Sequence, residues 1–261
     1  MSSYEQRFGG TARIYSAQAL EVYRQCHVCV VGIGGVGSWV AEALVRSGIG
    51  EITLIDLDDI CVTNTNRQVH VLSTTIGQSK VSVMAERLRE INPECLVHEE
   101  HAFISADNVR ELIGEHMHYV VDAIDEVPAK AALIAHCKRN KVSVVTVGGA
   151  GGQLDPTRVD VADLSRTEQD PLAAKVRSYL RRHYGFSKSG RRFAVECVYS
   201  SEQLKYPMPD GSVSAEKVTA GRAMDCSTGF GAATVVTTTF GMVAASRVLI
   251  KIQQKIAAGT W

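Results

Sequence analysis

The sequence lacks the features that mark several common classes of protein. Neither charge is in excess, because 28 Lys and Arg residues balance 28 Asp and Glu residues. Nucleic acid binding would therefore have to come from a local patch rather than from the whole molecule. The seven cysteines are odd in number and scattered, which excludes a regular disulfide framework and favours a reducing cytoplasm. No basic segment followed by an apolar run stands at the start, so we expect no secretory signal.

Cysteine pairs of the kind that hold structural zinc are almost absent. The one CxxC pair is Cys26 and Cys29, at the entrance to the first expected strand, where the two thiols should point to opposite faces. A metal site needs further ligands, and none stands nearby in the sequence, so we expect no zinc. We expect Cys61 to be a packing residue. For Cys226 we favour a small buried residue, with a catalytic or sulfur-accepting thiol as the alternative.

Long uncharged runs are absent except for residues 226–246. This run is long enough to span a membrane, but its five threonines and two serines leave it only modest bulky apolar content. We therefore expect a helix buried against a sheet and no membrane span, although hydropathy alone could select the segment as one.

The first 150 residues contain short apolar runs that alternate with amphipathic stretches. Such alternation is typical of parallel βαβ units with right-handed crossovers. The sequence therefore predicts an α/β fold with a Rossmann-like, doubly wound and mostly parallel sheet. Strands are expected at 27–32, 51–56, 95–103, 118–125 and 142–149, and helices at 36–47, 79–93, 106–113 and 127–141.

The pattern changes after Gly152. We expect one domain over residues 1–261, made of a nucleotide-binding core (1–152) and a second part (153–261). The second part should contain a strand pair at 153–164, a basic segment at 165–192, a strand at 193–200, a loop at 204–214 and a long helix from Thr228 to about residue 257.

A glycine-rich loop joins the first expected strand to the first expected helix. It reads GIGGVGS, with glycines at Gly32, Gly34, Gly35 and Gly37. Glycines let a phosphate approach the backbone closely, and the start of the helix supplies free N–H groups and partial positive charge. Asp56 ends the second strand, where a carboxylate can bond a ribose hydroxyl. At this point NAD and ATP remain equally open.

The next segment favours ATP. Residues 56–68 read DLDDICVTNTNRQ, and Lys80 follows at the start of a helix. Arg67 and Lys80 would neutralise the phosphates and the charge that develops as pyrophosphate leaves. Mg²⁺ prefers carboxylates together with phosphate oxygens, and two aspartates end the fourth strand. The further candidate nucleotide contacts are Asp58, Asn64, Asp122 and Asp125.

These motifs resemble the ubiquitin-activating-enzyme-like adenylating superfamily, alongside its ThiF and MoeB types, over roughly residues 5–150. The resemblance rests on GIGGVGS, DLDDICVTNTNRQ, Lys80 and DAID. It implies Asp56 on the ribose, Asn64, Arg67 and Lys80 on the phosphates, and Asp125 on Mg²⁺. It also implies a homodimer in which an N-terminal arginine reaches the neighbouring subunit's site; Arg7 is the better candidate and Arg13 the other.

The opening YEQRFGGTARIY, the spelling NTNRQ and the late CSTGFGAATVVT resemble one branch in particular. That branch is the family of bacterial tRNA threonylcarbamoyladenosine dehydratases. The resemblance implies tRNA as partner, ATP and Mg²⁺ as cofactors, and ATP-dependent cyclisation of N6-threonylcarbamoyladenosine at position 37 through adenylation of its threonine carboxylate. It also implies association with a cysteine desulfurase and its sulfur acceptor. Whether Na⁺ or K⁺ binds is left open.

The chemistry agrees with that resemblance. A carboxylate is a poor electrophile, and adenylation replaces its oxygen with AMP, a good leaving group. The carbamoyl nitrogen of the same side chain can then close a ring, with the large advantage of an intramolecular attack. We therefore expect no obligatory thioester on an enzyme cysteine.

The basic segment at 165–192 carries eight Arg or Lys residues against two acids. Four of these cations are spaced so that they could share one broad helix face, with Tyr179 and Tyr184 interleaved. Such a patch suits tRNA phosphates, and RNA bases often stack on aromatic rings. A merely solvated charged helix remains the alternative. The four candidate tRNA contacts are Lys175, Arg177, Arg181 and Arg182.

Two other functions remain open from the sequence. One is adenylation of the C-terminus of a ubiquitin-like sulfur-carrier protein. The basic segment and the missing zinc cysteines argue against it. The other is a non-enzymatic or NAD-binding Rossmann module, which would be indifferent to the loss of Arg67 or Lys80.

Overall fold

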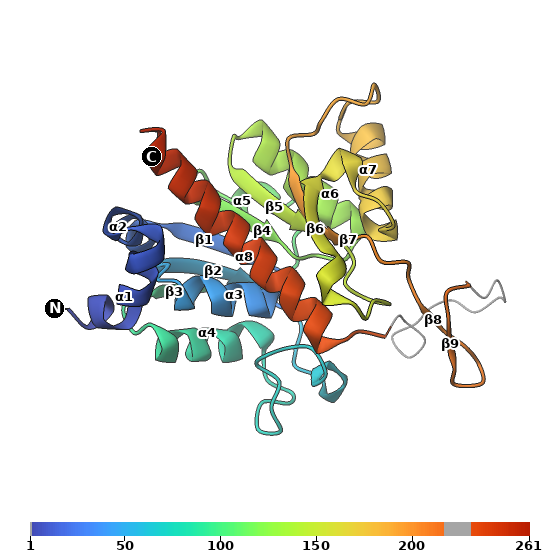
Figure 1. Cartoon of the computed structure of the whole chain (residues 1–261), viewed down its shortest axis with the longest axis horizontal. Coiled ribbons are helices and arrows are strands. Elements are labelled where there is room, and N and C mark those ends of the chain that lie inside the picture. The colour runs from blue at the N-terminus through green and yellow to red at the C-terminus, as the bar shows by residue number, and fades with distance from the viewer. Residues whose placement is uncertain (1, 217–230) are drawn as a thin grey trace.

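The computed structural model describes residues 2–216 and 231–261 (Figure 1). Its strands are β1 (His27–Val31), β2 (Glu51–Ile55), β3 (Leu96–Glu100), β4 (Tyr119–Asp122), β5 (Ser143–Val147), β6 (Val159–Asp163), β7 (Glu196–Ser200), β8 (Tyr206–Pro207) and β9 (Val213–Ser214). Its α-helices are α1 (Ser3–Tyr15), α2 (Ala17–Gln25), α3 (Gly37–Arg46), α4 (Lys80–Ile91), α5 (Val109–Leu112), α6 (Val127–Arg139), α7 (Pro171–His183) and α8 (Thr234–Ala257). Short 3₁₀ turns lie at Val62–Asn64, Pro156–Arg158 and Leu164–Arg166.

Seven strands form one sheet in the order β3-β2-β1-β4-β5-β7-β6. Every neighbouring pair is parallel except β6 and β7. The chain winds outward from β1 in one direction and from β4 in the other, so the topology reverses between these two strands. Ligands bind at the carboxyl ends of the strands at such a switch point. The predicted doubly wound α/β fold is confirmed.

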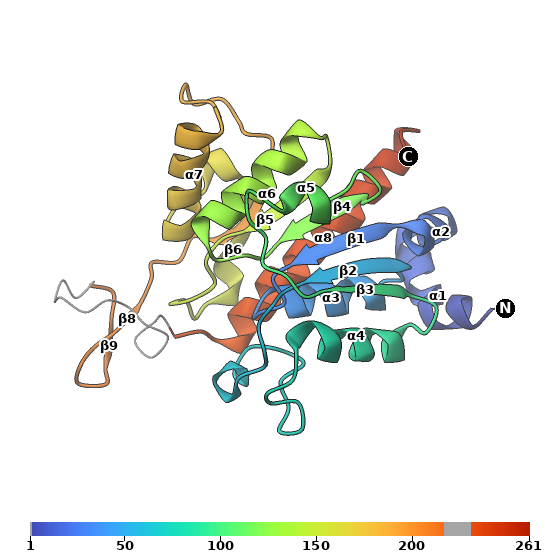
Figure 2. The same ribbon diagram turned by 180° about the vertical axis from the view of Figure 1, so that it is seen from behind.

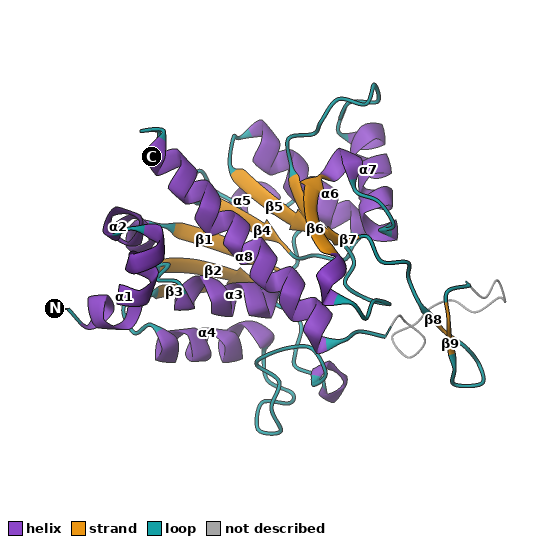
Figure 3. Cartoon of the chain, viewed as in Figure 1, coloured by secondary structure: helices purple, strands orange, loops and turns teal. Residues whose placement is uncertain are grey.

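Helices cover both faces of this sheet (Figures 2 and 3). One face packs against α2, α3, α4 and α8, and the other against α5, α6 and α7. Side chains that alternate along a strand serve both cores, because successive residues point to opposite faces. Cys26 lies in the first core and Cys29 in the second, so the predicted separation of these thiols is confirmed.

The second part of the chain departs from two expectations. The strand pair predicted at 153–164 is wrong, because only β6 forms there. The residues before it make a 3₁₀ turn in which Asp155 caps Pro156–Arg158. The segment expected to be a loop contains the short hairpin of β8 and β9. The last helix begins at Thr234, and residues 226–230 of the uncharged run lie outside the described residues.

The helix α8 has the length and composition of a membrane span, with a mean hydropathy of 1.5. Half of its most apolar window is buried in the structure, and it packs along α3 and the sheet, as Figure 1 shows. Phe240, Val248 and Ile252 belong to the same core as β1. The expected helix buried against a sheet is therefore confirmed.

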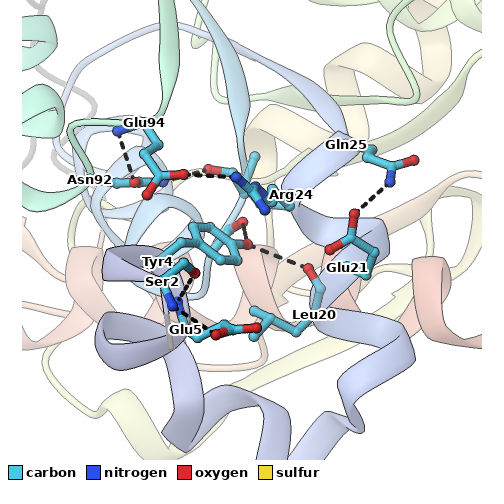
Figure 4. Close-up of polar contacts among 11 residues, drawn as sticks. Ser2, Tyr4, Glu5, Leu20, Glu21, Arg24, Gln25, Asn92 and Glu94 are labelled. Carbon is cyan, nitrogen blue, oxygen red and sulfur yellow. Dashed lines mark hydrogen bonds and ion pairs between the residues drawn. The ribbon is translucent and has the colours of Figure 1, made fainter.

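The sequence patterns did not predict α1 and α2, which pack together beside the amino-terminal ends of the strands (Figure 1) and whose polar contacts are drawn in Figure 4. Tyr4 is buried, and its hydroxyl donates to the carbonyl of Gly48. Gly48 has a φ of +98°, and a Cβ there would lie 2.8 Å from that hydroxyl. Arg24 pairs with Glu94 at 2.9 Å and lies over the Tyr4 ring, which ties α2 to the end of α4.

Candidate active site

The glycine loop turns sharply between β1 and α3. Gly32 has a φ of +88°, which glycine adopts without strain. A Cβ on Gly37 would lie 1.8 Å from the carbonyl oxygen of Gly32. A Cβ on Gly32 would in turn lie 2.8 Å from the carbonyl oxygen of Ala123, next to β4. Larger residues would push the loop away from the switch point, so these two glycines set its shape.

The start of α3 is open to an anion. Helices α4, α6 and α7 are each capped by a side chain, from Ser79, Glu126 and Asp170 respectively. By contrast, Val36 at the start of α3 makes no side-chain cap. A helix start without such a cap has N–H groups and partial positive charge that are suited to a phosphate. Gly34 is the most open glycine of the loop, because a Cβ at this position would have no atom closer than 3.9 Å.

Asp56 and Asp58 organise the loop that follows β2. Asp56 is buried, and its carboxylate accepts from the N–H groups of Ile33 at 2.6 Å and Asp58 at 2.9 Å. The Asp56 carboxylate therefore holds the glycine loop in place through the Ile33 N–H. Each of its two oxygens can still accept a further hydrogen bond. Lys80 is buried as well, and its ammonium lies 2.6 Å from Asp58 Oδ2. Asp58 is about half exposed, so the pair opens toward solvent.

Asn64 and Arg67 belong to the loop between these two positions. The Asn64 side chain accepts from the Cys61 N–H and closes the 3₁₀ turn. Arg67 Nη1 donates to the Thr63 carbonyl and to Asn66 Oδ1, both at 2.9 Å. A Cβ on Gly35 would lie 3.2 Å from the methylene groups of Arg67, so the aliphatic part of this side chain lies against the glycine loop. The structure thus brings Asp56, Asp58, Arg67 and Lys80 to one place.

Asp122 does not face this site, contrary to the prediction that it contacts the nucleotide. Its side chain is fully buried, and Lys130, also buried, lies 3.0 Å from Oδ2. Thr146 donates to Oδ2 at 2.6 Å and the Ile124 N–H to Oδ1 at 3.2 Å. Burial raises the pKa of the Asp122 carboxyl, and the Lys130 charge opposes that rise. Asp122 is therefore a buried structural partner that anchors the loop after β4.

Asp125 lies at the end of that anchored loop and is exposed. Among the described residues, none makes a hydrogen bond or ion pair to its carboxylate. Lys130 donates to the Ile124 carbonyl at 2.9 Å, which holds the backbone just before Asp125. Since β4 neighbours β1, this free carboxylate lies at the switch point beside the glycine loop.

Three polar side chains near the loop are buried without partners. Ser38 Oγ, Gln68 Oε1 and both ring nitrogens of His70 make no hydrogen bond within the described residues. Buried polar groups normally have one. None of the three was singled out from the sequence, because burial is not visible in a polar segment. Burial, together with the charges of Lys80 and Arg87, lowers the pKa of His70 to about 4.

This depressed pKa predicts a loss of stability in mild acid. The unfolded state, with a histidine pKa near 6.5, binds the proton more readily, so stability falls as pH drops from about 7 toward 4. Between pH 7 and pH 5 the protonation of His70 should lower the free energy of unfolding by about 2 kcal/mol. Urea midpoints should show a smaller pH dependence in His70→Leu than in the native chain. The exposed-histidine control His101→Leu should keep the native dependence; equal dependence in all three would contradict the prediction.

Arg7 does not reach this site within its own chain. Its Nη1 donates to the carbonyl of Ile91 at 3.4 Å, at the far end of the helix that Lys80 begins. Eleven residues of α-helix separate Lys80 from Ile91, a rise of about 16 Å. The exposed Arg7 therefore lies at the opposite edge of the sheet, and its expected role in a neighbouring subunit's site stays a prediction.

The four cations of α7 do not share one solvent-facing side, which corrects the prediction. Arg177 donates to the carbonyls of Leu164 and Thr167. Arg181 Nε donates to the Ser187 carbonyl, and its guanidinium lies over the Phe193 ring. These two arginines hold the segment to the protein. Only Lys175 and Arg182, seven residues apart on the exposed side, are free to meet a partner.

Two cysteine expectations have different outcomes. Cys61 is exposed rather than a packing residue, because the 3₁₀ turn at Val62–Asn64 carries it out of the core. The Thr63 hydroxyl donates to its sulfur at 3.2 Å and lowers the pKa of the thiol. Cys226 lies outside the described residues, so its role stays a prediction.

Comparison with known proteins agrees with this geometry. The model of the ThiF family matches residues 9–258. The chain belongs to the ThiF family. It is 56% identical to the tRNA threonylcarbamoyladenosine dehydratase of Escherichia coli (strain K12), over 98% of this chain and 96% of that protein. These matches confirm the resemblance inferred from the sequence motifs.

Two solved structures extend the ThiF-family match to the whole fold. One is TcdA (CsdL), with a TM-score of 0.91 and 55% identity over 97% of this chain and 96% of that chain. The other is the E. coli tRNA N6-threonylcarbamoyladenosine dehydratase TcdA in complex with ATP. Its TM-score is 0.89, with 52% identity over 99% of this chain and 98% of that chain. The shared fold thus extends to a relative that binds ATP.

Proposed function

We propose that this chain is an ATP-dependent tRNA threonylcarbamoyladenosine dehydratase. It adenylates the threonine carboxylate of N6-threonylcarbamoyladenosine at tRNA position 37 and so drives cyclisation of that group. The observation that carries the proposal is the juxtaposition of an uncapped helix start with the Lys80–Asp58 pair and Arg67 at the switch point. Full-length similarity to a dehydratase and to an ATP-bound relative supports it.

ATP fits the residues present. Gly34 leaves the backbone open beside the start of α3, where a phosphate is stabilised, and the Arg67 side chain lies against the neighbouring Gly35. Asn64, Arg67 and Lys80 contact the phosphates, and Asp56 bonds the ribose with its remaining accepting capacity. Desolvation strengthens the attraction between a buried ammonium and a phosphate, so Lys80 should contribute more than an exposed lysine.

Magnesium fits the exposed carboxylate of Asp125, which no protein group engages among the described residues. Hard cations take oxygen ligands, and Mg²⁺ commonly binds one or two carboxylates together with phosphate oxygens. When bound it neutralises charge on the phosphates. Asp122 is not part of this site, since Lys130 and Thr146 already occupy its carboxylate.

The proposed reaction has two steps, adenylation of the substrate carboxylate and then ring closure. A carboxylate oxygen of the substrate attacks the α-phosphorus of ATP, and pyrophosphate leaves while Arg67 and Lys80 stabilise its charge. The carbamoyl nitrogen then attacks the activated carbonyl carbon, AMP leaves with the carboxylate oxygen, and the nitrogen loses its proton. The net result is loss of the elements of water from the base, with ATP converted to AMP and pyrophosphate.

The direct test is mass spectrometry of tRNA nucleosides after incubation with protein and ATP. The modified nucleoside should lose 18 mass units, the mass of water, only when both ATP and protein are present. Pyrophosphate exchange that depends on a ubiquitin-like sulfur carrier, and not on modified tRNA, would instead support the alternative function.

The exposed side of α7 is the proposed tRNA contact. Asp170 accepts from the Gly149 N–H, just after β5, and from the Ala173 N–H. This pair of bonds holds the start of α7 at the carboxyl edge of the sheet. Lys175 lies one turn into the helix and therefore near the edge of the sheet that carries the nucleotide site. Arg182 follows two turns later.

Charge reversal on α7 should weaken tRNA binding and spare ATP binding. Lys175→Glu and Arg182→Glu should each reduce the slope of log affinity against log salt by about 1, as expected when one phosphate contact is lost. Filter binding at several salt concentrations measures this slope. Arg110→Glu, which reverses an exposed cation on α5, is the control, and equal slopes in all three variants would move the tRNA surface elsewhere.

The remaining expectations follow from this function. A homodimer would bring Arg7 of one subunit to the nucleotide of the other. A cytoplasmic setting suits an enzyme of tRNA and ATP. Association with a cysteine desulfurase and its sulfur acceptor, and binding of Na⁺ or K⁺, stay predictions; pull-down and ion-dependence assays test them.

A further inference from the structure

Three side chains with metal-binding atoms converge on neighbouring strands, far from the nucleotide site. His27 begins β1, Glu51 begins β2 and His98 lies on β3. His27 is in register with Glu51, and His98 with Thr53, two residues farther along β2. Residues two apart on a strand share a face, so all three side chains project from the same face. About 16 Å of β1 separates this cluster from the glycine loop.

The distances match those of a metal site. Glu51 Oε1 lies 3.3 Å from His27 Nδ1 and 2.9 Å from His98 Nε2. The three ligand atoms all lie within 4.8 Å of one another. Ligands at 2.0–2.1 Å from a tetrahedral zinc ion stand about 3.4 Å apart. Only small shifts would therefore place an ion among these three atoms.

A second observation concerns the orientation of the buried ligand. His27 Nε2 lies 2.7 Å from the Thr53 hydroxyl. With the proton on Nε2 donated to Thr53, the lone pair of Nδ1 faces Glu51. Histidines that bind metals usually donate their other ring N–H to such a partner, which fixes the tautomer and the ring plane.

We propose that His27, Glu51 and His98 bind a divalent first-row transition-metal ion such as Zn²⁺. Two imidazoles and one carboxylate suit such an ion. The centre of the His116 ring lies 5.2 Å from that of the His27 ring, so a third imidazole stands beside the three ligands. Because the site lies at the opposite edge from the nucleotide, the ion is structural and pins the edge strand β3 to β2 and β1.

The expectation of no zinc rested on the cysteines, and this site uses none of them. Its ligands are 24 and 47 residues apart in the sequence, so no spacing motif announces them. The inference does not depend on the proposed function.

The test uses the full chain without an affinity tag, freed of metal by a chelator. Co²⁺ titration should produce visible d–d absorption that saturates at one ion per chain, and Zn²⁺ should displace it. Zn²⁺ in hundredfold excess over its Kd should raise Tm by roughly 5 °C, because it binds only the folded state.

Matched variants locate the site. His98→Ala and Glu51→Gln should each weaken Co²⁺ binding at least tenfold, whereas His101→Ala, which removes an exposed histidine just past the carboxyl end of β3, should not change it. His98 is half exposed, so its variant should fold. Absence of a saturating one-to-one signal in the native chain, or native affinity in His98→Ala, would overturn the proposal.

Discussion

Replacing Asp125 by alanine should lower kcat/KM for modified tRNA at least about a hundredfold while the fold stays intact. Electrostatic stabilisation by a bound cation contributes several kcal/mol to a phosphoryl-type transition state, and 1.36 kcal/mol corresponds to a factor of ten. Asp125 is exposed and bonded to no described residue, so its removal leaves no buried group unpaired. Steady-state kinetics with saturating ATP, alongside thermal melting, measures both halves of the prediction.

The control for Asp125 is Asp107→Ala, which removes another exposed carboxylate, in the turn before α5. Its kcat/KM should remain within a factor of two of the native value. A more specific check is the concentration of Mg²⁺ needed for half-maximal rate, which should rise in Asp125→Asn and not in the control. Near-native turnover of Asp125→Ala would remove this residue from the mechanism.

The core of the fold could be predicted because its signals are local. In residues 27–149, apolar runs of strand length alternate with segments of helical periodicity. The apolar runs become strands of the sheet, and the periodic segments become the helices that pack on it. The glycine loop could also be predicted, since Gly32 and Gly37 serve a turn whose sterics exclude any Cβ. Since parallel strands end at one edge, the positions of Asp56 and Asp125 at that edge followed as well.

The errors arise where a side chain's partner lies elsewhere in the chain. Asp122 ends β4 and Asp125 follows three residues later, and nothing local shows that Lys130 from α6 and Thr146 from β5 enclose only Asp122. The sequence does not distinguish Arg177 from Lys175, because the carbonyls of Leu164 and Thr167 that accept from Arg177 belong to another segment of the chain. The helices α1 and α2 were missed for a similar reason, because Tyr4 and Phe8 find their apolar contacts against Leu20 only after folding.

Lys130→Met should lower the free energy of unfolding by about 3–5 kcal/mol, the usual result when one partner of a buried ion pair is removed. Lys130 is 1% exposed and Asp122 fully buried, so the variant leaves a carboxylate in the core with only Thr146 and a backbone N–H. Urea unfolding measures the loss. Lys138→Met, an exposed lysine on the same helix, should change stability by no more than about 0.5 kcal/mol.

The companion variants separate a structural role for Asp122 from a role in binding nucleotide. Asp122→Asn combined with Lys130→Met removes both charges, and should recover part of the stability that Lys130→Met alone loses, because coupled residues are not additive. The folded double variant should still bind ATP, since Arg67, Lys80 and the uncapped start of α3 remain. If the double variant is folded at the assay temperature yet has lost ATP affinity tenfold or more, Asp122 contacts the nucleotide and its role is not only structural.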